Sequence, residues 1–389
     1  MLGVTKLLCG TDNYGDRLRY VPGAGLQRHG TGEGHGPVVA WNCTRSCNLK
    51  CQHCYSGSEN RKYENELTTT EAKKLMDDLS DFKVPVILIS GGEPLIREDL
   101  PEVLQYARSR SIRCTVSTNG TLIDKEYAKV LKQCGAGYVG ISLDGIGQRH
   151  DGFRGVKGSF DKALAGIRNC LDIGQKVGLR FTISSYNFDQ LADIFYLIKE
   201  EKIPRVCFYH LVYSGRSMVE QDITHEQMRE AMDMIMDKAV ELGDGTEILT
   251  VDNHADAVYL YLQACRRYQV ISAEIFELLK MNGGNRSGIA FGNVDSQGYV
   301  HPDQFTQQHI LGNVRDRAFS DIWTDTSHPL MKWLKDRKAL LKGRCGQCNW
   351  LDICNGNFRS RAEAVAGDFW AQDPACYLTD EEIGIKGEM

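Results

Sequence analysis

The sequence lacks a long hydrophobic run, because no window supplies the roughly 20 apolar residues that a membrane-spanning helix needs. It also lacks an excess of basic residues, since 46 lysines and arginines stand against 51 aspartates and glutamates, for a formal net charge of -5. Proteins whose main partner is nucleic acid usually carry a basic surface. The opening residues, MLGVTKLLCG, form too short an apolar run for a secretion signal. We therefore expect no membrane span, no nucleic-acid partner and a cytoplasmic location.

Cysteine, by contrast, is abundant, with 14 in the chain. Without a secretion signal, this number indicates a reducing compartment and metal ligation rather than disulfides. Cys47, Cys51 and Cys54 form the stretch CNLKCQHC. Three cysteines can hold three corners of a cubane iron–sulfur cluster, so the fourth iron is left open for chemistry. Zinc is the alternative, but closed zinc sites use four ligands, commonly as two pairs, and no second pair with finger-like spacing follows Cys54.

From Pro37 onward, short apolar runs rich in β-branched residues alternate with segments of helical periodicity. The runs are 38–42, 84–90, 112–118, 138–144, 177–184 and 205–212, and the helical segments between them are 69–81, 98–110, 124–134, 159–174 and 187–202. Such alternation predicts an α/β fold with a parallel sheet and right-handed crossovers. Six units are fewer than the eight of a full barrel, and the pattern alone does not decide whether the sheet closes.

Polar residues cluster where these runs end, which is the edge at which parallel sheets carry their active sites. They are Gly91, Gly92, Glu93, Pro94, Ser117, Asn119, Ser142, Asp144 and Arg180. The two glycines allow close approach of a ligand, and Glu93 can accept a hydrogen bond from an ammonium group. Ser117 and Asn119 suit a ribose, and Arg180 suits a carboxylate. Each alone is ordinary turn chemistry, but together with the cysteine stretch they indicate a binding site.

Further candidates follow the last run. Tyr209, His210 and Arg216 lie on it or at its exit, whereas His254 and His301 lie in the region beyond residue 245. A lone histidine is more often a satisfied structural residue than a functional one, so each histidine is only a candidate for contact with a substrate or metal. An apolar stripe over 225–242 is most simply part of the core, and the residues 295–298 predict a hairpin turn.

A second cysteine group lies near the C-terminus. Cys345, Cys348, Cys354 and Cys376 supply four sulfurs, which complete the ligand set of a closed cubane cluster. A structural zinc site with four cysteine ligands explains the spacing as well, so both alternatives stay open at this point.

The stretch CNLKCQHC resembles the C-x3-C-x2-C signature of radical S-adenosylmethionine (SAM) enzymes, and GGEP at 91–94 resembles that family's motif for the methionine amino group. The resemblance implies a partial (β/α)6 barrel, a [4Fe-4S] cluster on the three cysteines, and SAM bound by the residues at the strand ends. His53 and Tyr55 of the cysteine stretch are then expected beside the cofactor. The C-terminal group resembles a SPASM/twitch extension and implies a second [4Fe-4S] cluster. Asp303 stands where a further cysteine is usual, which favours one auxiliary cluster rather than two.

The resemblance also implies a division into a lead-in at 1–36, a barrel at 37–245 and an auxiliary-cluster region at 246–389. The lead-in is rich in glycine and polar residues and predicts an extended or loop-like segment. Its glycines do not form a phosphate-binding loop, because no predicted strand precedes them and no helix follows.

More narrowly, the segments HLVYSGR, LTVDNHAD, VHPDQF and ICNGNFRSRAEAVAGD are similar to the tetrapyrrole-modifying branch of this family. The resemblance implies loss of two acetate side chains from didecarboxysiroheme to give iron-coproporphyrin III in the alternative haem pathway. Removal of propionates from the same substrate, in haem d1 synthesis, is the alternative. An electron donor of low potential, such as ferredoxin or flavodoxin, is implied as well.

An iron macrocycle with several carboxylates calls for arginines, and Arg154, Arg216 and Arg286 are the candidates. His254 or His301 is the candidate for contact with the iron. His210, Tyr209, Arg216 and His254 form the expected catalytic set.

Two other classes of protein are alternatives to this interpretation. A peptide maturase of the SPASM type usually has an N-terminal recognition domain, for which the glycine-rich lead-in is too short. An electron-transfer protein needs no SAM pocket, so the GGEP loop speaks against it.

Overall fold

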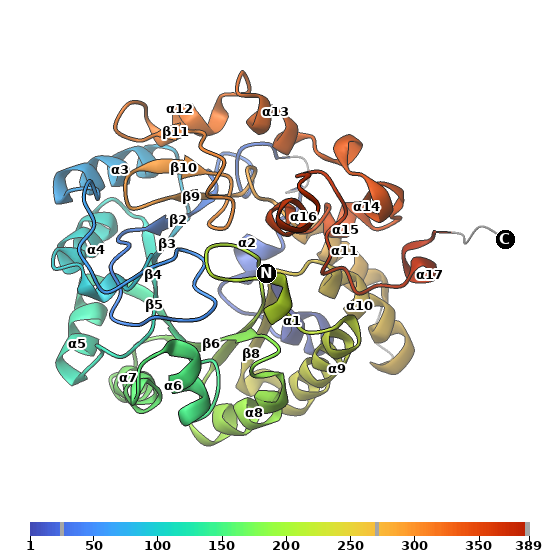
Figure 1. The fold of residues 1–389 in the computed structure, drawn as a ribbon, viewed down its shortest axis with the longest axis horizontal. Coiled ribbons are helices and arrows are strands. Elements are labelled where there is room, and N and C mark those ends of the chain that lie inside the picture. The colour runs from blue at the N-terminus through green and yellow to red at the C-terminus, as the bar shows by residue number, and fades with distance from the viewer. Residues whose placement is uncertain (24–26, 269–271, 386–389) are drawn as a thin grey trace. The chain divides into compact units, whose positions relative to one another are not determined.

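A computed structural model of the chain describes residues 1–23, 27–268 and 272–385. It contains two compact units, each assembled from separate stretches of sequence (Figure 1). We call them the sheet unit, Gln27–Phe181 with Ser287–Lys335, and the terminal unit, Met1–Leu26 with Thr182–Arg286 and Asp336–Met389. The predicted boundaries near residues 36 and 245 cut the chain into three continuous parts instead, and they stay predictions.

The sheet unit is built on parallel strands that neighbour one another in the order of the sequence. They are β2 (Val38–Asn42), β3 (Val86–Ser90), β4 (Arg113–Thr118), β5 (Ala136–Ser142) and β6 (Val177–Ile183). Val86, Ile87 and Ile89 of β3 are buried, as expected of a strand covered on both faces. The predicted parallel sheet is confirmed, and these strands match the first five predicted runs to within two residues at either end.

Helices follow these strands, and local caps explain where they begin. They are α3 (Thr69–Asp81), α4 (Leu100–Ser109), α5 (Lys125–Cys134), α6 (Gln148–Arg154) and α7 (Ser159–Asp172). Thr68 and Glu71 form a capping box at the start of α3, and the Asp124 side chain accepts the Tyr127 N–H at the start of α5. The sequence did not predict α6, because its seven residues, QRHDGFR, show no apolar periodicity.

The other edge of the sheet unit comes from later residues. Strand β9 (Phe291–Val294) pairs in parallel with β2, and β10 (Tyr299–His301) and β11 (Gly312–Asn313) continue the sheet in antiparallel pairing. The predicted turn at 295–298 is confirmed, since the Gly298 N–H donates to the Asp295 carbonyl at 3.1 Å. Helices α12 (Phe319–Thr324) and α13 (Pro329–Lys335) complete the unit.

The terminal unit contains parallel strands β7 (Arg205–His210) and β8 (Glu247–Val251), with β1 (Leu2–Gly3) antiparallel to β8. Helix α8 (Leu191–Glu200) precedes β7, and α9 (His225–Leu242) confirms the predicted amphipathic helix. The loop-like expectation for the lead-in is wrong for its first residues, which form β1 and α1 (Val4–Cys9). The reason is apolar burial, since Leu2, Val4 and Leu7 are shielded from solvent.

The rest of the terminal unit is made of shorter helices. They are α2 (Asp16–Arg19), α10 (Ala255–Gln263), α11 (Ser272–Asn282), α14 (Gly343–Gln347), α15 (Leu351–Cys354), α16 (Arg359–Ala366) and α17 (Asp380–Ile383). In the second cysteine group, Cys345 lies on α14 and Cys348 directly after it, Cys354 is the last residue of α15, and Cys376 lies in the loop between α16 and α17.

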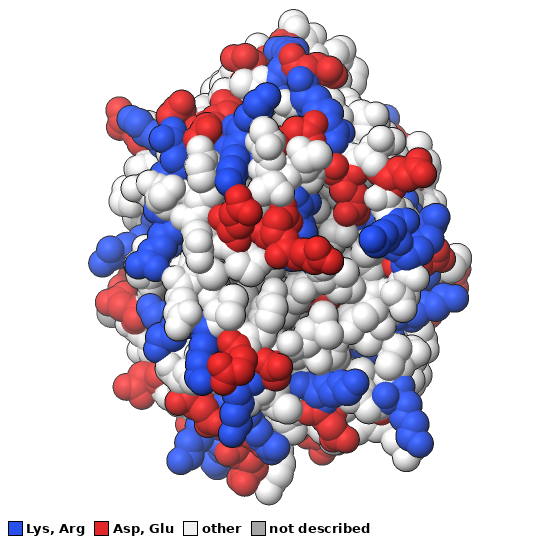
Figure 2. All heavy atoms as spheres, turned by 90° about the vertical axis from the view of Figure 1, so that its left-hand side faces the viewer, with Lys and Arg blue, Asp and Glu red and all other residues white. Residues whose placement is uncertain are grey.

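The surface carries charges of both signs. On the face in Figure 2, lysine and arginine side chains are interspersed with aspartate and glutamate side chains. Lys73 of α3, for example, pairs with Glu102 of α4 at 2.5 Å. No helix within the described ranges has the length and apolarity that a membrane crossing requires.

We use Met76 to test the core of the sheet unit, because it lies on the buried face of α3 and is fully shielded from solvent. Met76→Ala leaves a cavity, so we expect the free energy of unfolding to fall by about 2–5 kcal/mol. Chemical denaturation followed by circular dichroism measures this change. Lys74→Ala on the exposed side of the same helix should change it by less than about 0.5 kcal/mol, and equal losses in both variants would contradict the predicted burial.

Candidate active site

The loop between β2 and α3 carries Cys47, Cys51 and Cys54. Cys47 and Cys51 are buried together with Leu49, and the partly buried Cys54 packs against them. Burial raises the pKa of Cys47 to about 12, and the negative charges of Glu93, Cys51 and Cys54 add to the rise. The three sulfurs therefore lie near one another, as the ligands of one cluster must.

Each sulfur of this loop accepts a hydrogen bond. The Leu49 N–H donates to Cys47 Sγ, and the Ser58 N–H donates to Cys54 Sγ, both at 3.4 Å. The Arg154 guanidinium donates to Cys51 Sγ at 3.4 Å. Metal ligation requires the thiolate form of cysteine, and donors aimed at sulfur stabilise its negative charge and tune the potential of a bound cluster. These donors therefore reduce the cost of the thiolate form that a cluster requires.

The donor set fits three corners of a cubane. Across residues 1–23, 27–268 and 272–385, no three His, Cys, Asp or Glu side chains surround one point as the ligands of a single metal ion would. A cubane holds its irons at separate corners, so its cysteine ligands stand farther apart than the ligands of one ion. Cys47, Cys51 and Cys54 are the residues that would hold such a cluster.

The loop after β3 is fastened to the cysteine loop through backbone contacts. The N–H of Gly92 donates to the Thr44 carbonyl at 2.7 Å, and that of Glu93 to the Ser46 carbonyl at 2.8 Å. A Cβ atom on Gly91 would lie 2.2 Å from the Thr44 oxygen, and one on Gly92 2.2 Å from the Ser46 oxygen. The glycines therefore allow two backbone segments to approach each other, whereas the sequence suggested the approach of a ligand.

Glu93 is fully buried among hydrogen-bond donors. Its Oε1 atom accepts from the Thr118 hydroxyl at 2.6 Å and the Leu95 N–H at 3.1 Å, and its Oε2 atom accepts from the Asn119 N–H at 2.7 Å. Burial raises the pKa of this carboxyl group, against the effect of the three donors. A carboxylate oxygen can accept two hydrogen bonds, so Oε2 retains capacity for an ammonium group.

The structure brings the other strand-end residues to the same edge. The Asn119 side chain donates to Asn48 Oδ1 of the cysteine loop at 2.8 Å. Arg180 donates to Ser117 Oγ at 2.9 Å, and Ser142 is its register partner on the adjacent strand. These amide, hydroxyl and guanidinium groups are the kinds that bind a ribose and a carboxylate.

Asp144 and Arg154 are paired with each other. Asp144 is fully buried, forms an ion pair with Arg154, and donates its backbone N–H to His150 Nδ1 at 3.0 Å. The Arg154 guanidinium therefore contacts both the Asp144 carboxylate and the Cys51 sulfur. The sequence predicts Arg154 against a substrate carboxylate, whereas the structure pairs it with Asp144. The contact of Asp144 with SAM stays a prediction.

The aromatic residues of the cysteine stretch are held by stacking and hydrogen bonding. His53 stacks on Phe153, with ring centroids 4.4 Å apart. The Tyr55 hydroxyl donates to Asn42 Oδ1 at 3.1 Å, and burial raises its pKa to about 12. Pro94 is buried at the start of a single 3-10 turn, Pro94–Ile96.

The second cysteine group gathers in the terminal unit. Burial raises the pKa of Cys354 well above its usual value, and the negative charges of Cys376, Cys345 and Cys348 add to this effect. The Trp350 N–H donates to Cys348 Sγ at 3.4 Å. Four neighbouring sulfurs suit a closed cubane cluster or a zinc ion equally by donor type.

A buried chain of polar groups runs from the neighbour of Cys376 to the end of β7. The Tyr377 hydroxyl donates to Asp256 Oδ1 at 2.8 Å, and Asp256 Oδ2 lies 3.0 Å from His210 Nε2. Burial acts to lower the pKa of His210, but the Asp256 carboxylate outweighs it and raises the pKa. The sequence predicts a role for His210 but for neither partner, although the quoted segment LTVDNHAD ends with Asp256.

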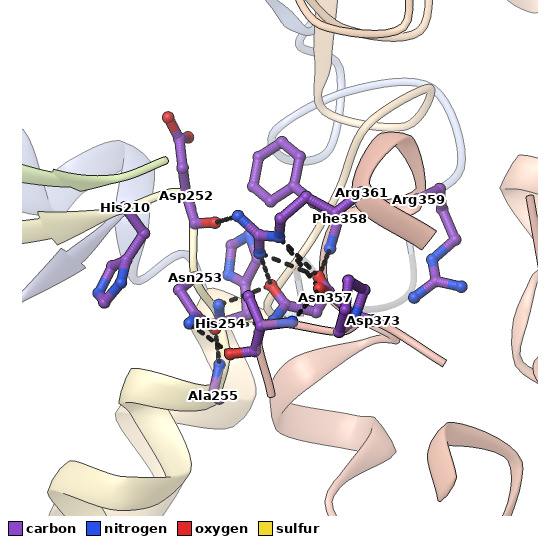
Figure 3. A network of polar contacts seen from close by, with 12 residues as sticks. His210, Asp252, Asn253, His254, Ala255, Asn357, Phe358, Arg359, Arg361 and Asp373 are labelled. Carbon is purple, nitrogen blue, oxygen red and sulfur yellow. Dashed lines mark hydrogen bonds and ion pairs between the residues drawn. The ribbon is translucent and has the colours of Figure 1, made fainter. Parts of the chain in front are cut away.

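A second polar network surrounds Arg361 and was also missed (Figure 3). Arg361 and Asp373 are both fully buried and form an ion pair at 2.9 Å. Arg361 also donates to the backbone carbonyls of Leu211 at 3.0 Å and Asp252 at 2.7 Å. This pair therefore fixes the loops that follow β7 and β8 to the cysteine-bearing segment.

The remaining predicted residues lie in different settings. Tyr209 packs in the core with Cys207, Leu249 and Val251, which favours a structural role. His301 belongs to the sheet unit, where its Nδ1 atom lies 3.0 Å from the His309 carbonyl oxygen. Arg216 and Arg286 are partly exposed in the terminal unit. Burial lowers the pKa of Arg286 to about 10. His254 lies in the same unit, after β8.

Comparison with known proteins agrees with this site. The model of the radical SAM superfamily matches residues 41–198, which include the cysteine loop and the Glu93 loop. Fe-coproporphyrin III synthase of Methanosarcina barkeri is 54% identical, with 99% of each chain covered. Pre-heme d1 synthase of Dinoroseobacter shibae is 43% identical, with 91% of this chain and 89% of that protein covered. The structure of Streptococcus suis SuiB bound to S-adenosylmethionine has a TM-score of 0.70 at 19% identity, covering 89% of this chain and 78% of that one.

An α/β sheet with a three-cysteine loop at its ligand-binding edge defines a SAM-dependent iron–sulfur enzyme. The chain belongs to the radical SAM superfamily. The partial (β/α)6 fold with a SPASM-type extension is confirmed by the likeness to SuiB. Membership implies a [4Fe-4S] cluster and bound SAM.

We expect Cys51→Ala to reduce the formation of 5′-deoxyadenosine to background, because two sulfurs do not hold the cluster with its open iron. Liquid chromatography of anaerobic reactions with SAM and dithionite measures this product. Cys265→Ala is the matched control, since Cys265 is exposed and lies outside both cysteine groups. Equal SAM cleavage in the wild type and Cys51→Ala would contradict the assignment.

Proposed function

We propose that this enzyme removes two acetate side chains from didecarboxysiroheme and thereby produces iron-coproporphyrin III. The observation that carries the proposal is the 54% identity, over 99% of both chains, to Fe-coproporphyrin III synthase. Similarity along the whole length includes the terminal unit, where sequence would differ most if the substrate were a peptide. The choice of substrate depends on the residues that contact it rather than on the shared fold.

The sheet unit supplies the residues for the cofactors. Cys47, Cys51 and Cys54 hold the cluster, and Glu93 Oε2 accepts a hydrogen bond from the SAM ammonium group. Arg180 faces the SAM carboxylate, with the other strand-end residues around the ribose. When bound, the reduced cluster and SAM supply a 5′-deoxyadenosyl radical that takes a hydrogen atom from the substrate. The fully buried Glu93 supports this arrangement, because a carboxylate in a dry site attracts a cation strongly.

The terminal unit supplies a second cluster site and substrate contacts. Cys345, Cys348, Cys354 and Cys376 hold an auxiliary [4Fe-4S] cluster with no open iron. His210 supports a substrate role, since its Nδ1 atom is buried and has no hydrogen-bond partner among the described residues. An N–H at this atom can donate to a substrate carboxylate. Arg216 and Arg286 are the candidates for the other carboxylates.

Electrons come from a donor of low potential, for which a ferredoxin or flavodoxin is our proposal. We also propose a cytoplasmic location, because the chain has 14 cysteines and cysteines in a reducing compartment ligate metals rather than form disulfides.

Removal of propionates instead of acetates is the second candidate. The 43% identity to pre-heme d1 synthase, over 91% of this chain, favours it. The higher identity and coverage of Fe-coproporphyrin III synthase place this candidate second.

Product mass separates the two candidates. We expect anaerobic incubation with SAM, dithionite and didecarboxysiroheme to give a tetrapyrrole of the mass of iron-coproporphyrin III, as measured by mass spectrometry. Loss of two propionates would establish the alternative. Cleavage of SAM without any change in the tetrapyrrole would contradict both.

The second cysteine group is tested separately. We expect Cys348→Ala to keep the formation of 5′-deoxyadenosine and to reduce tetrapyrrole conversion, because Cys348 belongs to the terminal unit and the SAM ligands to the sheet unit. Iron and sulfide analysis should show the loss of one cluster. Iron for one cluster only, together with bound zinc in the wild type, would instead identify a structural zinc site.

A further inference from the structure

His254 is held in place by contacts with Asn357 and Phe358. It follows β8 and precedes α10, and its backbone N–H donates to Asn357 Oδ1 at 2.8 Å. Its ring stacks on Phe358, with centroids 5.7 Å apart and an interplanar angle of 15°. Figure 3 shows the ring beside Phe358 within the Arg361 network. The imidazole is thus held by its backbone and by one face of the ring.

The residues around His254 are locked by further hydrogen bonds. The Asn253 side chain donates to the Ala375 carbonyl at 2.9 Å and accepts from the Asn357 side chain at 2.7 Å. Asn357 Oδ1 also accepts from Arg361 at 3.3 Å. Asn253, Asn357 and Arg361 are all buried. Such a buried and satisfied network fixes geometry, so the direction of the imidazole is set in advance.

The ring nitrogens of His254 take no part in this network. Neither forms a hydrogen bond or ion pair with a residue in the described ranges, whereas its backbone N–H does. Other histidines in this protein are used differently, since His210 contacts Asp256 and His150 accepts the Asp144 N–H. His254 is partly exposed rather than sealed, so a ligand can reach its ring.

The ring is also kept uncharged. Burial first, and then neighbouring positive charges that include Arg361 and Arg337, hold the pKa of His254 well below its usual value. Neutral imidazole is the form that ligates metals. In the part of the chain that the structure describes, no acidic side chain is paired with the ring, so it would act as a neutral donor of moderate strength.

We propose that His254 is an axial ligand of the iron in the tetrapyrrole substrate. The inference rests on the proposed function, because that function brings an iron macrocycle to this chain. Iron in a macrocycle accepts an imidazole ligand on its open face. His254 then acts as a positioning residue, since one coordinate bond fixes the centre of the macrocycle and leaves its edge free to react.

Pulsed electron paramagnetic resonance (EPR) with isotope labelling tests this bond directly. Ferric coproporphyrin III is added to the full-length, reconstituted protein with oxidised clusters. Oxidised [4Fe-4S] clusters have no EPR signal, so the ferric macrocycle is observed alone. Protein labelled with 15N-histidine should show a 15N coupling to the ferric iron, distinct from the 14N couplings of the pyrrole nitrogens. Absence of this coupling in the wild type would overturn the inference.

Substitutions identify the histidine. We expect His254→Ala to lose the 15N coupling and to regain it when 15N-imidazole is added. His35→Ala is the matched control, because His35 is exposed on the sheet unit, and it should keep the coupling. The cluster content should be unchanged in His254→Ala, because no proposed cluster ligand is altered. If alanine lowers the cluster content, His254→Gln preserves the size of the side chain and should lose the coupling as well.

The outcomes separate this inference from the proposed function. Retention of the 15N coupling in His254→Ala overturns the assignment of the ligand, whatever the product is. Conversion of didecarboxysiroheme by a wild type without the coupling overturns the inference and leaves the function standing. A wild type that neither binds the ferric macrocycle nor converts the substrate overturns both.

Discussion

The close approach of two backbone segments determines the arrangement of the SAM-binding side. The loop after β3 lies so near the cysteine loop that a Cβ on Gly91 or Gly92 would stand 2.2 Å from a carbonyl oxygen. Two backbone hydrogen bonds then set the spacing between the cysteine loop and Glu93. A cluster-binding loop and a carboxylate that belong to different strands therefore keep one geometry. Side chains at the two glycines would separate them.

In the terminal unit, a buried ion pair fixes the positions of the loops. Arg361 and Asp373 are both removed from water, which is costly unless every donor and acceptor is satisfied. Arg361 meets this condition by donating to backbone carbonyls after β7 and β8 as well as to Asp373. The pair therefore ties together loops that carry His210, His254 and the second cysteine group. Removal of either partner would leave an uncompensated buried charge.

The sequence predicted what depends on local pattern. The parallel strands appeared as apolar runs, and helical periodicity located α3 and α5 to within one residue at either end. The sequence also predicted that Cys47, Cys51 and Cys54 act together, and the structure places them near one another; their binding of a cluster stays a prediction. The partners of the polar groups were not: Tyr377 and Asp256 are 121 residues apart in sequence and meet only in the folded chain. Asp144 could not be distinguished from a free strand-end carboxylate, because its pairing with Arg154 depends on α6, which has no apolar periodicity.

Burial favours the neutral form of the cysteine thiols and of the His254 imidazole, with different consequences for the binding of a metal. It raises the pKa of Cys47 and Cys376 to about 12, so these sulfurs become thiolates only when iron supplies positive charge. Assembly of the clusters must then release protons, and the donors already aimed at the sulfurs reduce the cost. For His254, burial lowers the pKa and leaves a lone pair ready, so ligation of an iron by this ring releases no proton. The cysteines proposed as cluster ligands therefore suit permanent metal sites, whereas a neutral imidazole suits a metal that arrives and leaves with each turnover.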